Sequence, residues 1–364
     1  MKKFYLILLF FFSMMPCKAT DNLDDITITN FPIIDGSDST ELLRLILMSK
    51  LLGFEYEWVS SPFVQNPDEA PNSVVPQYIG DEDEIRGFRN KCLLNSNTHR
   101  SFVNLIDDKV ELIITARSIS RDEKAYADEK GVKLIEKPIA RDALAFIVNI
   151  KNPIVSLSIE QIQGIYTGDI VNWSEVGGQD CEIKPYVRNR NSGSQEKFET
   201  MVMVGLTIKD FPEMQIGTTM MSPYYQLDND VAGIAYTPFY YFTYISGTAS
   251  SKVIGVNGVP MTKENVKNGT YPYTSNVYAA VRSDIDKSSM AYRMFEFLTT
   301  GEGQAIVAES GYVPMNSIPT VIHSIDNSAM KPQSNIIYDL SGRKISNGLK
   351  KGIYIQNGKK IAVK

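Results

Sequence analysis

The sequence predicts an α/β protein of two domains. Its 364 residues are enough for two domains of ordinary size, at roughly 150 residues each. Short apolar stretches typical of strands alternate with apolar-periodic stretches typical of helices, and small polar loops join them. Hydrophobic residues make up 43% of the chain and charged residues 22%, which is typical of a folded globular protein and not of a disordered one.

The first 19 residues have the pattern of a secretory signal peptide. Two lysines precede an apolar stretch, residues 4–12, that is too short to span a bilayer, and small residues end at Ala19. We therefore predict cleavage after Ala19 and export to the periplasm or the cell surface. Cys17 raises the alternative of a lipid-anchored lipoprotein, but the preceding residues 14–16 fit a lipoprotein signal poorly.

Charge and cysteine content exclude some classes of function. The formal net charge is −5, and no basic face with interleaved aromatic residues is present, so no nucleic-acid partner is expected. The cysteines beyond the signal peptide are Cys92 and Cys181. They lie about ninety residues apart without the spacing of a disulfide framework, and we expect both to be free.

The chain has few residues suited to catalysis or to metal binding. Its two histidines are His99 and His323, too few to assemble a zinc site or a Ser-His-Asp triad with ease. A hydrolase with Ser192 or Ser194 as nucleophile remains an alternative, although the sequence lacks a nucleophile-elbow motif. We predict a protein that is not an enzyme and that needs neither cofactor nor metal.

Residues 187–198, VRNRNSGSQEKF, predict a strand, a turn and the start of a helix. Ser192, Gly193 and Ser194 would lie at the helix start, where the first N–H groups have no partner inside the helix. Ser192 and Gln195 have the spacing of a capping box. Arg188 can offer two parallel donors to an oxyanion. The stretch therefore indicates an anion site; the alternative is a well-capped helix with solvated arginines.

Three further loops carry hydroxyl groups or arginine beside a predicted strand or helix start. Ligands of open α/β sheets gather at the carboxyl ends of strands, so we expect these loops to face one crevice. The residues in question are Ser39 and Thr40, Thr98 at a predicted helix cap, and Thr115 with Arg117.

The remaining pattern places elements along the chain. Strands are predicted at residues 26–28, 54–59, 111–114, 143–150 and 233–236. Helices are predicted at residues 41–52 and 158–166, the second opening with a capping box of Ser158 and Gln161. Residues 60–77 are rich in Pro, Asn and Ser and predict a surface loop.

With these segments in place, the chain resembles the phosphate-binding proteins of ABC importers, the PstS type. Six segments occur in the order of that family, and together they span about residues 30 to 316. They are GSDST at 36–40, ELIITAR at 111–117, residues 162–178 around NWSEVGG, RNRNSGS at 188–194, YPYTS at 271–275, and residues 303–314 ending in GYVP.

The resemblance implies a two-lobed periplasmic-binding-protein type II fold, in which two α/β lobes close on an anion around a two-segment hinge. The two crossovers would lie near Arg141 and Tyr273. Lobe one would comprise residues 24–141 plus 274–323, and lobe two residues 142–273.

The resemblance also implies a set of ligand residues. Arg188, Ser192, Gly193 and Ser194 match the family's arginine, serine, glycine and threonine that hold phosphate. Ser39 and Thr40 match its first-lobe threonine loop, and Thr98 falls where the family has a ligand serine. We add Thr115 and Arg117 from the loop that follows the predicted strand at 111–114.

Two positions depart from the family pattern. Ala116 stands at the position of the family's ligand aspartate, which accepts a proton from phosphate, and Arg190 replaces an acidic residue near the arginine. Loss of an acceptor and gain of positive charge would suit a more highly charged oxyanion, or phosphate held with less discrimination against sulfate.

The function that the resemblance implies is capture of inorganic phosphate, or a related oxyanion, for delivery to an ABC permease by a monomeric protein. The alternative is a surface-exposed interaction or sensory protein that reuses the fold without transport. Residues 331–364 favour the alternative, because their YDLSGR, GIYI and GKK segments resemble the C-terminal sorting signals of type IX secretion. Asn357-Gly358 within this tail is a hairpin signal.

Overall fold

The computed structural model describes residues 23–59, 73–77, 82–246 and 250–315, and four strands in the C-terminal segment. The predicted signal peptide and Cys17 lie outside the described residues. The chain divides into a large unit, residues 1–318, and a small one, residues 319–364.

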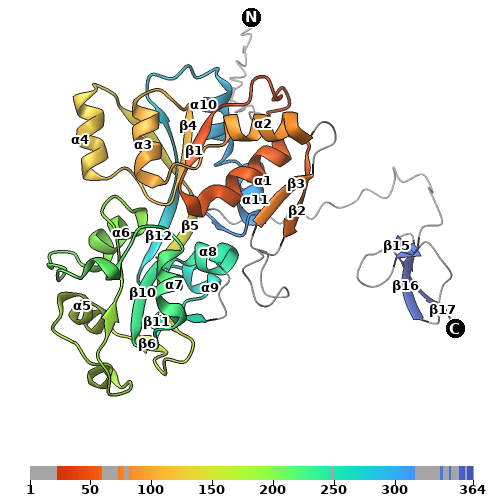
Figure 1. The fold of residues 1–364 in the computed structure, drawn as a ribbon. Helices are drawn as coiled ribbons and strands as arrows, with labels where there is room; N and C mark the ends of the chain where they lie inside the picture. Colours follow the sequence, from red (N-terminus) through yellow and green to blue (C-terminus); the bar gives the residue numbers. More distant parts are fainter. Residues whose placement is uncertain are drawn as a thin grey trace, which may run out of the picture. The chain divides into compact units, whose positions relative to one another are not determined.

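A mixed sheet runs through the large unit (Figure 1). Its first part has the order β1-β4-β12-β5, in which β1 and β4 are parallel and β12 is antiparallel to both of its neighbours. In its second part β5 pairs antiparallel with β10 and with β11. The bounds are β1 Ile34–Gly36, β4 Leu112–Thr115, β5 Leu134–Asn149, β10 Gly233–Pro238, β11 Ser251–Val256 and β12 Thr274–Arg282.

Strand β5 belongs to both parts of the sheet. Its residues up to Ala143 pair with β12, and those from Leu144 to Val148 pair with β10. The sequence predicts a strand only at 143–150, because that half is buried on both faces and forms a continuous apolar run. The half that starts at Leu134 contains charged residues and a proline, so the hydrophobic pattern does not reveal it.

Two hydrophobic cores lie on either side of the point where β5 changes partners. One is built from residues 23–140 and 277–312, with Tyr240 added. The other is built from residues 143–273, with Val313 added. This division of the apolar side chains supports the proposed lobe boundaries at Arg141 and Tyr273.

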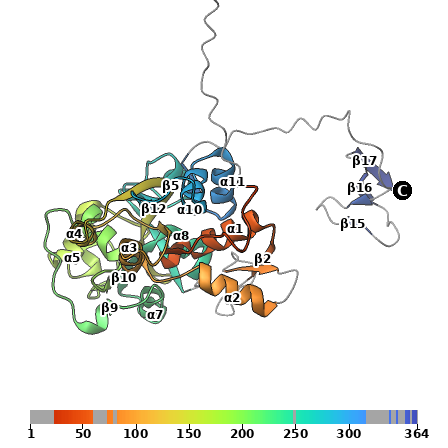
Figure 2. The same cartoon turned by 90° about the horizontal axis from the view of Figure 1, so that it is seen from above.

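Helices cover each part of the sheet; the two groups lie apart in Figure 1, and α4 of the first overlaps α5 of the second in the view from above in Figure 2. Those of the first part are α1 Glu41–Leu52, α2 Glu82–Cys92, α3 Thr98–Ile106, α4 Arg121–Glu129, α10 Met290–Phe297 and α11 Gly301–Glu309. Those of the second part include α5 Ile159–Thr167, α6 Gly193–Lys197, α7 Ser222–Asp228, α8 Phe239–Tyr241 and α9 Lys263–Lys267.

Two predicted helices are confirmed in detail. The helix predicted at 41–52 is α1, and it ends at Gly53, whose φ of 71° is the left-handed conformation that glycine adopts freely after a helix. Helix α5 opens with the predicted capping box, in which Ser158 and Gln161 each accept the backbone N–H of the other. Both helices have local signals at their ends that tertiary structure leaves unchanged.

Two predictions are wrong in part. Residues 26–28 form no strand, because the Asn30 side chain accepts the Thr27 N–H at 2.7 Å and holds a turn there. The predicted loop at 60–77 includes β3 Ser73–Gln77, which pairs with β2 Glu55–Val59. Residues 60–72 lie outside the described residues.

The small unit contains a four-stranded antiparallel sheet of order β15-β14-β16-β17. The strands are β14 Ile337–Tyr338, β15 Lys344–Ile345, β16 Gly352–Gln356 and β17 Lys359–Val363. Strands β16 and β17 pair on either side of Asn357-Gly358, where the sequence predicts a hairpin.

In the parts of the chain that the structure describes, no helix is both long and apolar enough to cross a membrane. The same residues contain no cluster of His, Cys, Asp and Glu that could hold a metal ion. Cys92 and Cys181 are both free, as predicted.

Candidate anion site between the lobes

A small cavity lies where segments of both lobes meet. Its volume is about 40 Å³, which admits a small ion or a few water molecules. One wall comes from the first lobe and the other from the second. The residues that line it are Ser37, Asp38, Ser39, Asn97, Thr98, Ala116, Arg188, Ser192, Gly193, Ser194, Lys197, Met220 and Pro238.

The second-lobe wall is the predicted 187–198 stretch. Strand β8 Val187–Arg188 pairs with β9 Ile216–Gly217, and α6 begins at Gly193. Arg188 is buried, and its Nε donates to the Gly217 carbonyl at 3.1 Å, which fixes the guanidinium at the cavity. Ser192 Oγ is buried without a hydrogen-bond partner among the described residues. A buried hydroxyl without a partner is costly, so this atom is suited to hydrogen-bond a ligand in the cavity.

The capping box predicted for Ser192 and Gln195 does not form. The Gln195 side chain instead accepts the Arg188 N–H at 3.0 Å and the Tyr236 hydroxyl. Ser192 occupies the N-cap position, but its side chain makes no cap bond. Gln195 therefore positions the strand that carries Arg188, and the hydroxyl of Ser192 is left for the cavity.

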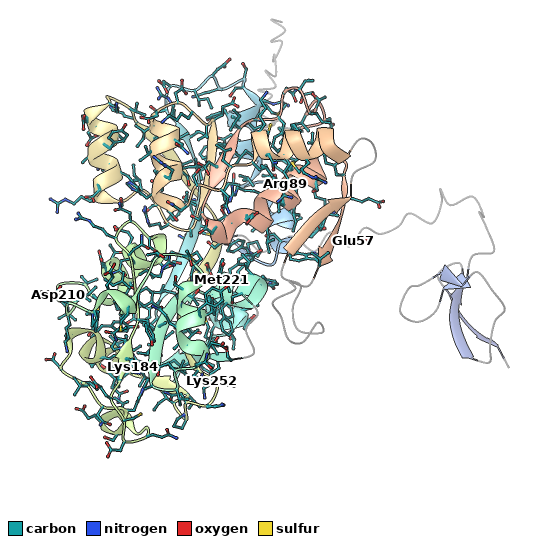
Figure 3. The ribbon with its side chains drawn as sticks, viewed as in Figure 1. Glu57, Arg89, Lys184, Asp210, Met221 and Lys252 are labelled. Atoms are coloured by element: carbon teal, nitrogen blue, oxygen red, sulfur yellow. The ribbon has the colours of Figure 1, made fainter. Side chains whose placement is uncertain are left out.

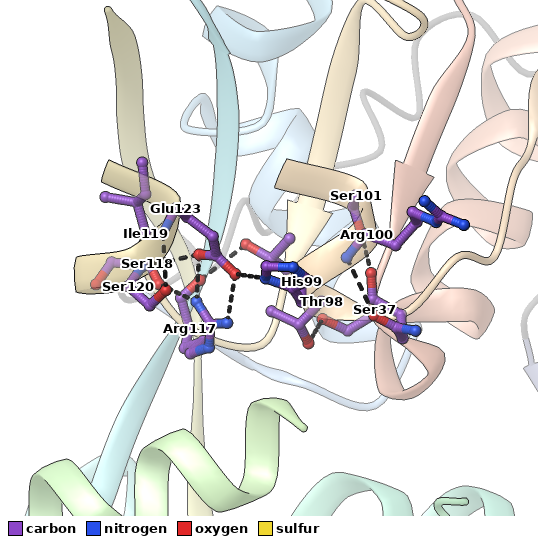
Figure 4. Close-up of polar contacts among 12 residues, drawn as sticks. Ser37, Thr98, His99, Arg100, Ser101, Arg117, Ser118, Ile119, Ser120 and Glu123 are labelled. Atoms are coloured by element: carbon purple, nitrogen blue, oxygen red, sulfur yellow. Dashed lines mark hydrogen bonds and ion pairs between the residues drawn. The ribbon is translucent and has the colours of Figure 1, made fainter. Parts of the chain in front are cut away.

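The first-lobe wall is a chain of hydroxyl groups. Ser37 Oγ and Thr98 Oγ1 lie 2.7 Å apart (Figure 4), and Ser37 Oγ accepts the Ala116 N–H at 2.9 Å. Thr98 is the first residue of α3 and not its cap, because Asn97 takes the N-cap position and accepts the Arg100 N–H. Both Asn97 and Thr98 line the cavity.

Six of the nine predicted ligand residues line this cavity, and three do not. Those that line it are Ser39, Thr98, Arg188, Ser192, Gly193 and Ser194. The other three, Thr40, Thr115 and Arg117, have polar groups engaged elsewhere. Thr40 Oγ1 donates to the carbonyls of Ile114 and Ser37, and Thr115 Oγ1 donates to the carbonyl of Arg117.

Arg117 is a structural residue in this geometry. Its Nη1 and Nη2 donate to the two carboxylate oxygens of Glu123 at 2.8 and 2.7 Å, and its guanidinium lies over the Phe102 ring. His99 Nδ1 lies 3.1 Å from the same carboxylate (Figure 4). The buried cation is therefore neutralised by Glu123, and we leave Thr40, Thr115 and Arg117 out of the proposed ligand set.

Four polar side chains of the cavity are not among the predicted ligands: Ser37, Asp38, Asn97 and Lys197. Ser37 follows strand β1 directly, and the short helix Asp38–Thr40 that comes next directs Thr40 away from the cavity, toward the Ile114 carbonyl. The amphipathic pattern of residues 193–203 places no lysine inside, so the sequence offers no signal for Lys197. Its burial depends on the neighbouring hinge strands.

The charges of the cavity are of both signs. Burial lowers the pKa of Arg188, which remains a cation because the guanidinium pKa starts very high. Burial raises the pKa of Asp38, while Arg188 and Arg44 oppose that rise. Exposed charges such as Glu57, Lys184 and Asp210 lie on the outer surfaces of the lobes (Figure 3). The charges that matter for a bound anion are the buried ones.

Two lobes joined by continuous strands, with an anion-sized cavity between them, define a solute-binding clamp. The profile of the family described as "PBP superfamily domain" matches residues 88–298, more than half of the chain. The chain belongs to this family.

Curated relatives confirm the predicted resemblance to the PstS type. The phosphate-binding protein PstS of Borreliella burgdorferi is 25% identical over 243 residues, which cover 60% of this chain and 81% of that protein. The protein SphX of Synechococcus elongatus is 25% identical over 231 residues, which cover 60% of this chain and 67% of that protein.

Solved structures confirm the predicted two-lobed fold. An ABC-type phosphate transport receptor from Vibrio cholerae superposes with a TM-score of 0.53 at 20% identity, covering 79% of this chain and 99% of that one. A substrate-binding protein assigned to a phosphate ABC transporter of Clostridium perfringens, solved with bound phosphate, gives 0.54 at 22% identity, covering 78% and 98%.

Proposed function

We propose that this protein is an exported solute-binding protein that captures inorganic phosphate between its lobes and delivers it to an ABC permease. The observation that carries the proposal is the cavity itself. Arg188 faces it from one lobe together with the Ser192 hydroxyl, which has no hydrogen-bond partner among the described residues. Ser37 and Thr98 face it from the other lobe. The names of the relatives support phosphate as the ligand and import as the purpose.

The proposed ligand set consists of Ser37, Ser39, Thr98, Arg188, Ser192, Gly193 and Ser194. Each charge-assisted hydrogen bond to an anion contributes roughly 1.5–3 kcal/mol, and several together offset the cost of fixing the ligand and closing the lobes. No step of catalysis is needed, which agrees with the relatives named as binding proteins.

Ala116 lies in the cavity wall, and its N–H is already donated to Ser37 Oγ. The position therefore offers the anion no carboxylate. We propose that the cavity holds phosphate with little discrimination against sulfate at this wall, and that Asp38 is the one carboxylate near the ligand among the residues that line the cavity.

Titration calorimetry of ligand-stripped protein with phosphate and with sulfate tests this function. We expect saturable binding of phosphate at one site per chain, with sulfate competing for the same site. The absence of binding heat with either anion at several temperatures would contradict the proposal. Export and the role of residues 331–364 are tested separately, by locating a full-length and a tail-truncated protein in cell fractions.

A further inference from the structure

A buried lysine faces the cavity from the side of the hinge. Lys197 is the last residue of α6, and its side chain is 3% exposed. It lines the same cavity as Arg188. Lysine is almost never buried to this extent without a partner, because its ammonium loses strong hydration. Its position beside an anion-sized cavity therefore requires an explanation.

The ammonium is held by one of the strands that connect the lobes. Lys197 Nζ donates to Ser275 Oγ on β12 at 2.8 Å. Within the described part of the chain this is the hydrogen bond that the Lys197 ammonium makes. Because an ammonium has three N–H donors, two donors remain for a ligand in the cavity.

A buried carboxyl group on the other connecting strand, Asp142, interacts with the charge of Lys197; burial raises the pKa of Asp142, and Lys197 opposes that rise. Burial lowers the pKa of Lys197, and Asp142 on β5 opposes this shift by Coulomb attraction, while nearby Arg117 adds to it. Asp142 Oδ1 accepts the Tyr240 N–H at 2.9 Å. No ion pair within 4.0 Å joins Asp142 to Lys197 among the described residues, so Asp142 favours the protonated lysine without occupying its donors.

We propose that Lys197 binds the anion directly, donating from the hinge side while Arg188 donates from β8. Ser275 and Asp142 act as positioning residues for its ammonium. The inference rests on the proposed function and refines its ligand class. Attraction to a second buried cation grows with the charge of the ligand, so Lys197 strengthens binding of a doubly charged tetrahedral oxyanion more than that of a singly charged one.

The competing explanation is that Lys197 only neutralises Asp142 and never contacts a ligand. Measuring phosphate affinity in three variants separates the two explanations. The variants are Lys197→Met, the double variant Lys197→Met/Asp142→Asn, and the exposed control Lys151→Met. Circular dichroism and thermal melting report whether each variant is folded. In the double variant no buried charge is left alone, so its stability should be close to that of the unaltered protein even if the single variant is unstable.

We expect Lys197→Met and the double variant each to bind phosphate about 10- to 100-fold more weakly, the loss that one charge-assisted hydrogen bond represents, and Lys151→Met to bind unchanged. Recovery of full affinity in the double variant would overturn the inference and leave the proposed function standing. So would unchanged affinity in a folded Lys197→Met. If the unaltered protein gives no binding heat with phosphate, the proposed function itself fails.

Discussion

Gly193 and Thr98 meet across the cavity, one from each lobe. A Cβ atom added at Gly193 would lie 2.5 Å from Thr98 Oγ1 and 3.2 Å from Thr98 Cβ. A contact of 2.5 Å requires a shift of the Thr98 side chain or of the backbone of one of the two segments. Close approach of the lobes therefore depends on the missing side chain at residue 193, in addition to the anion between them.

Gly193→Ala should bind phosphate more weakly without unfolding the protein. The added methyl group keeps the lobes from closing fully, at a cost of about 1–3 kcal/mol for an overpacked contact. Calorimetry measures the affinity, and small-angle scattering with and without phosphate measures closure. Gly301→Ala is the matched control, because a Cβ there meets nothing within 4 Å. Unchanged affinity and closure in Gly193→Ala would contradict the prediction.

Arg188→Ala should abolish measurable phosphate binding and leave the fold intact. The buried guanidinium is the strongest donor that β8 presents to the cavity, and its loss also leaves the Gly217 carbonyl without its Nε partner. Arg190→Ala serves as the control, since Arg190 is exposed and its ion pair with Asp122 is 3.7 Å long, a type that contributes little. Equal loss in both variants would mean that binding depends on surface charge.

Arg117→Met should reduce stability but not phosphate affinity. Removing the cation leaves the fully buried Glu123 without its arginine partner, which costs roughly 3 kcal/mol in such pairs. Urea unfolding measures the free energy of unfolding, and calorimetry on the folded protein measures affinity. A stable variant that no longer binds phosphate would return Arg117 to the ligand set that the sequence predicts.

Ala116→Asp should convert the cavity to one that prefers phosphate to sulfate. The new carboxylate can accept a proton that phosphate carries, and it repels sulfate, which has none to donate. We expect the ratio of phosphate to sulfate affinity to rise at least about 10-fold, or 1.4 kcal/mol. Ala116→Asn, of equal size and neutral, is the control. A ratio that is the same in both variants would locate discrimination elsewhere.

Sulfate affinity should rise as the pH falls through the acidic range, because of Asp38. Burial raises the pKa of this carboxyl above its usual value, so it takes up a proton at a higher pH than an ordinary aspartate. Above that folded-state pKa the carboxylate repels the anion, and below it the repulsion is gone. Asp38→Asn should bind sulfate with an affinity that no longer changes with pH in this range. Calorimetry across a pH series gives both curves.

Much of the fold and of the second-lobe wall could be predicted from the sequence. Arg188, Ser192 and Gly193 lie on one short segment whose strand–turn–helix pattern is local, so their meeting depends on few distant contacts. The first-lobe wall is different, because a short helix at Asp38–Thr40 decides whether Ser37 or Thr40 faces the cavity. That rotation depends on Thr40 finding the Ile114 carbonyl on the neighbouring strand β4.

The role of Lys197 is even harder to predict from the sequence. Its sequence neighbours predict a helix, and the solvated face of a helix is where lysine is normally found. Only the arrangement of β5 and β12 beside α6 supplies Ser275 and Asp142. Ser275 lies 78 residues from Lys197 along the chain, a separation at which no local sequence pattern operates.

The path of β5 and β12 has a consequence for the order in which the protein forms. The second-lobe core is built from residues 143–273, an unbroken segment apart from Val313. The first-lobe sheet places β12 between β4 and β5, and β12 is made after all of the second lobe. Because the chain is synthesised from its N-terminus, the second lobe can fold completely while the first-lobe sheet still lacks its central strand. Until the chain has been synthesised as far as Arg282, the edges of β4 and β5 that pair with β12 are exposed and available to chaperones.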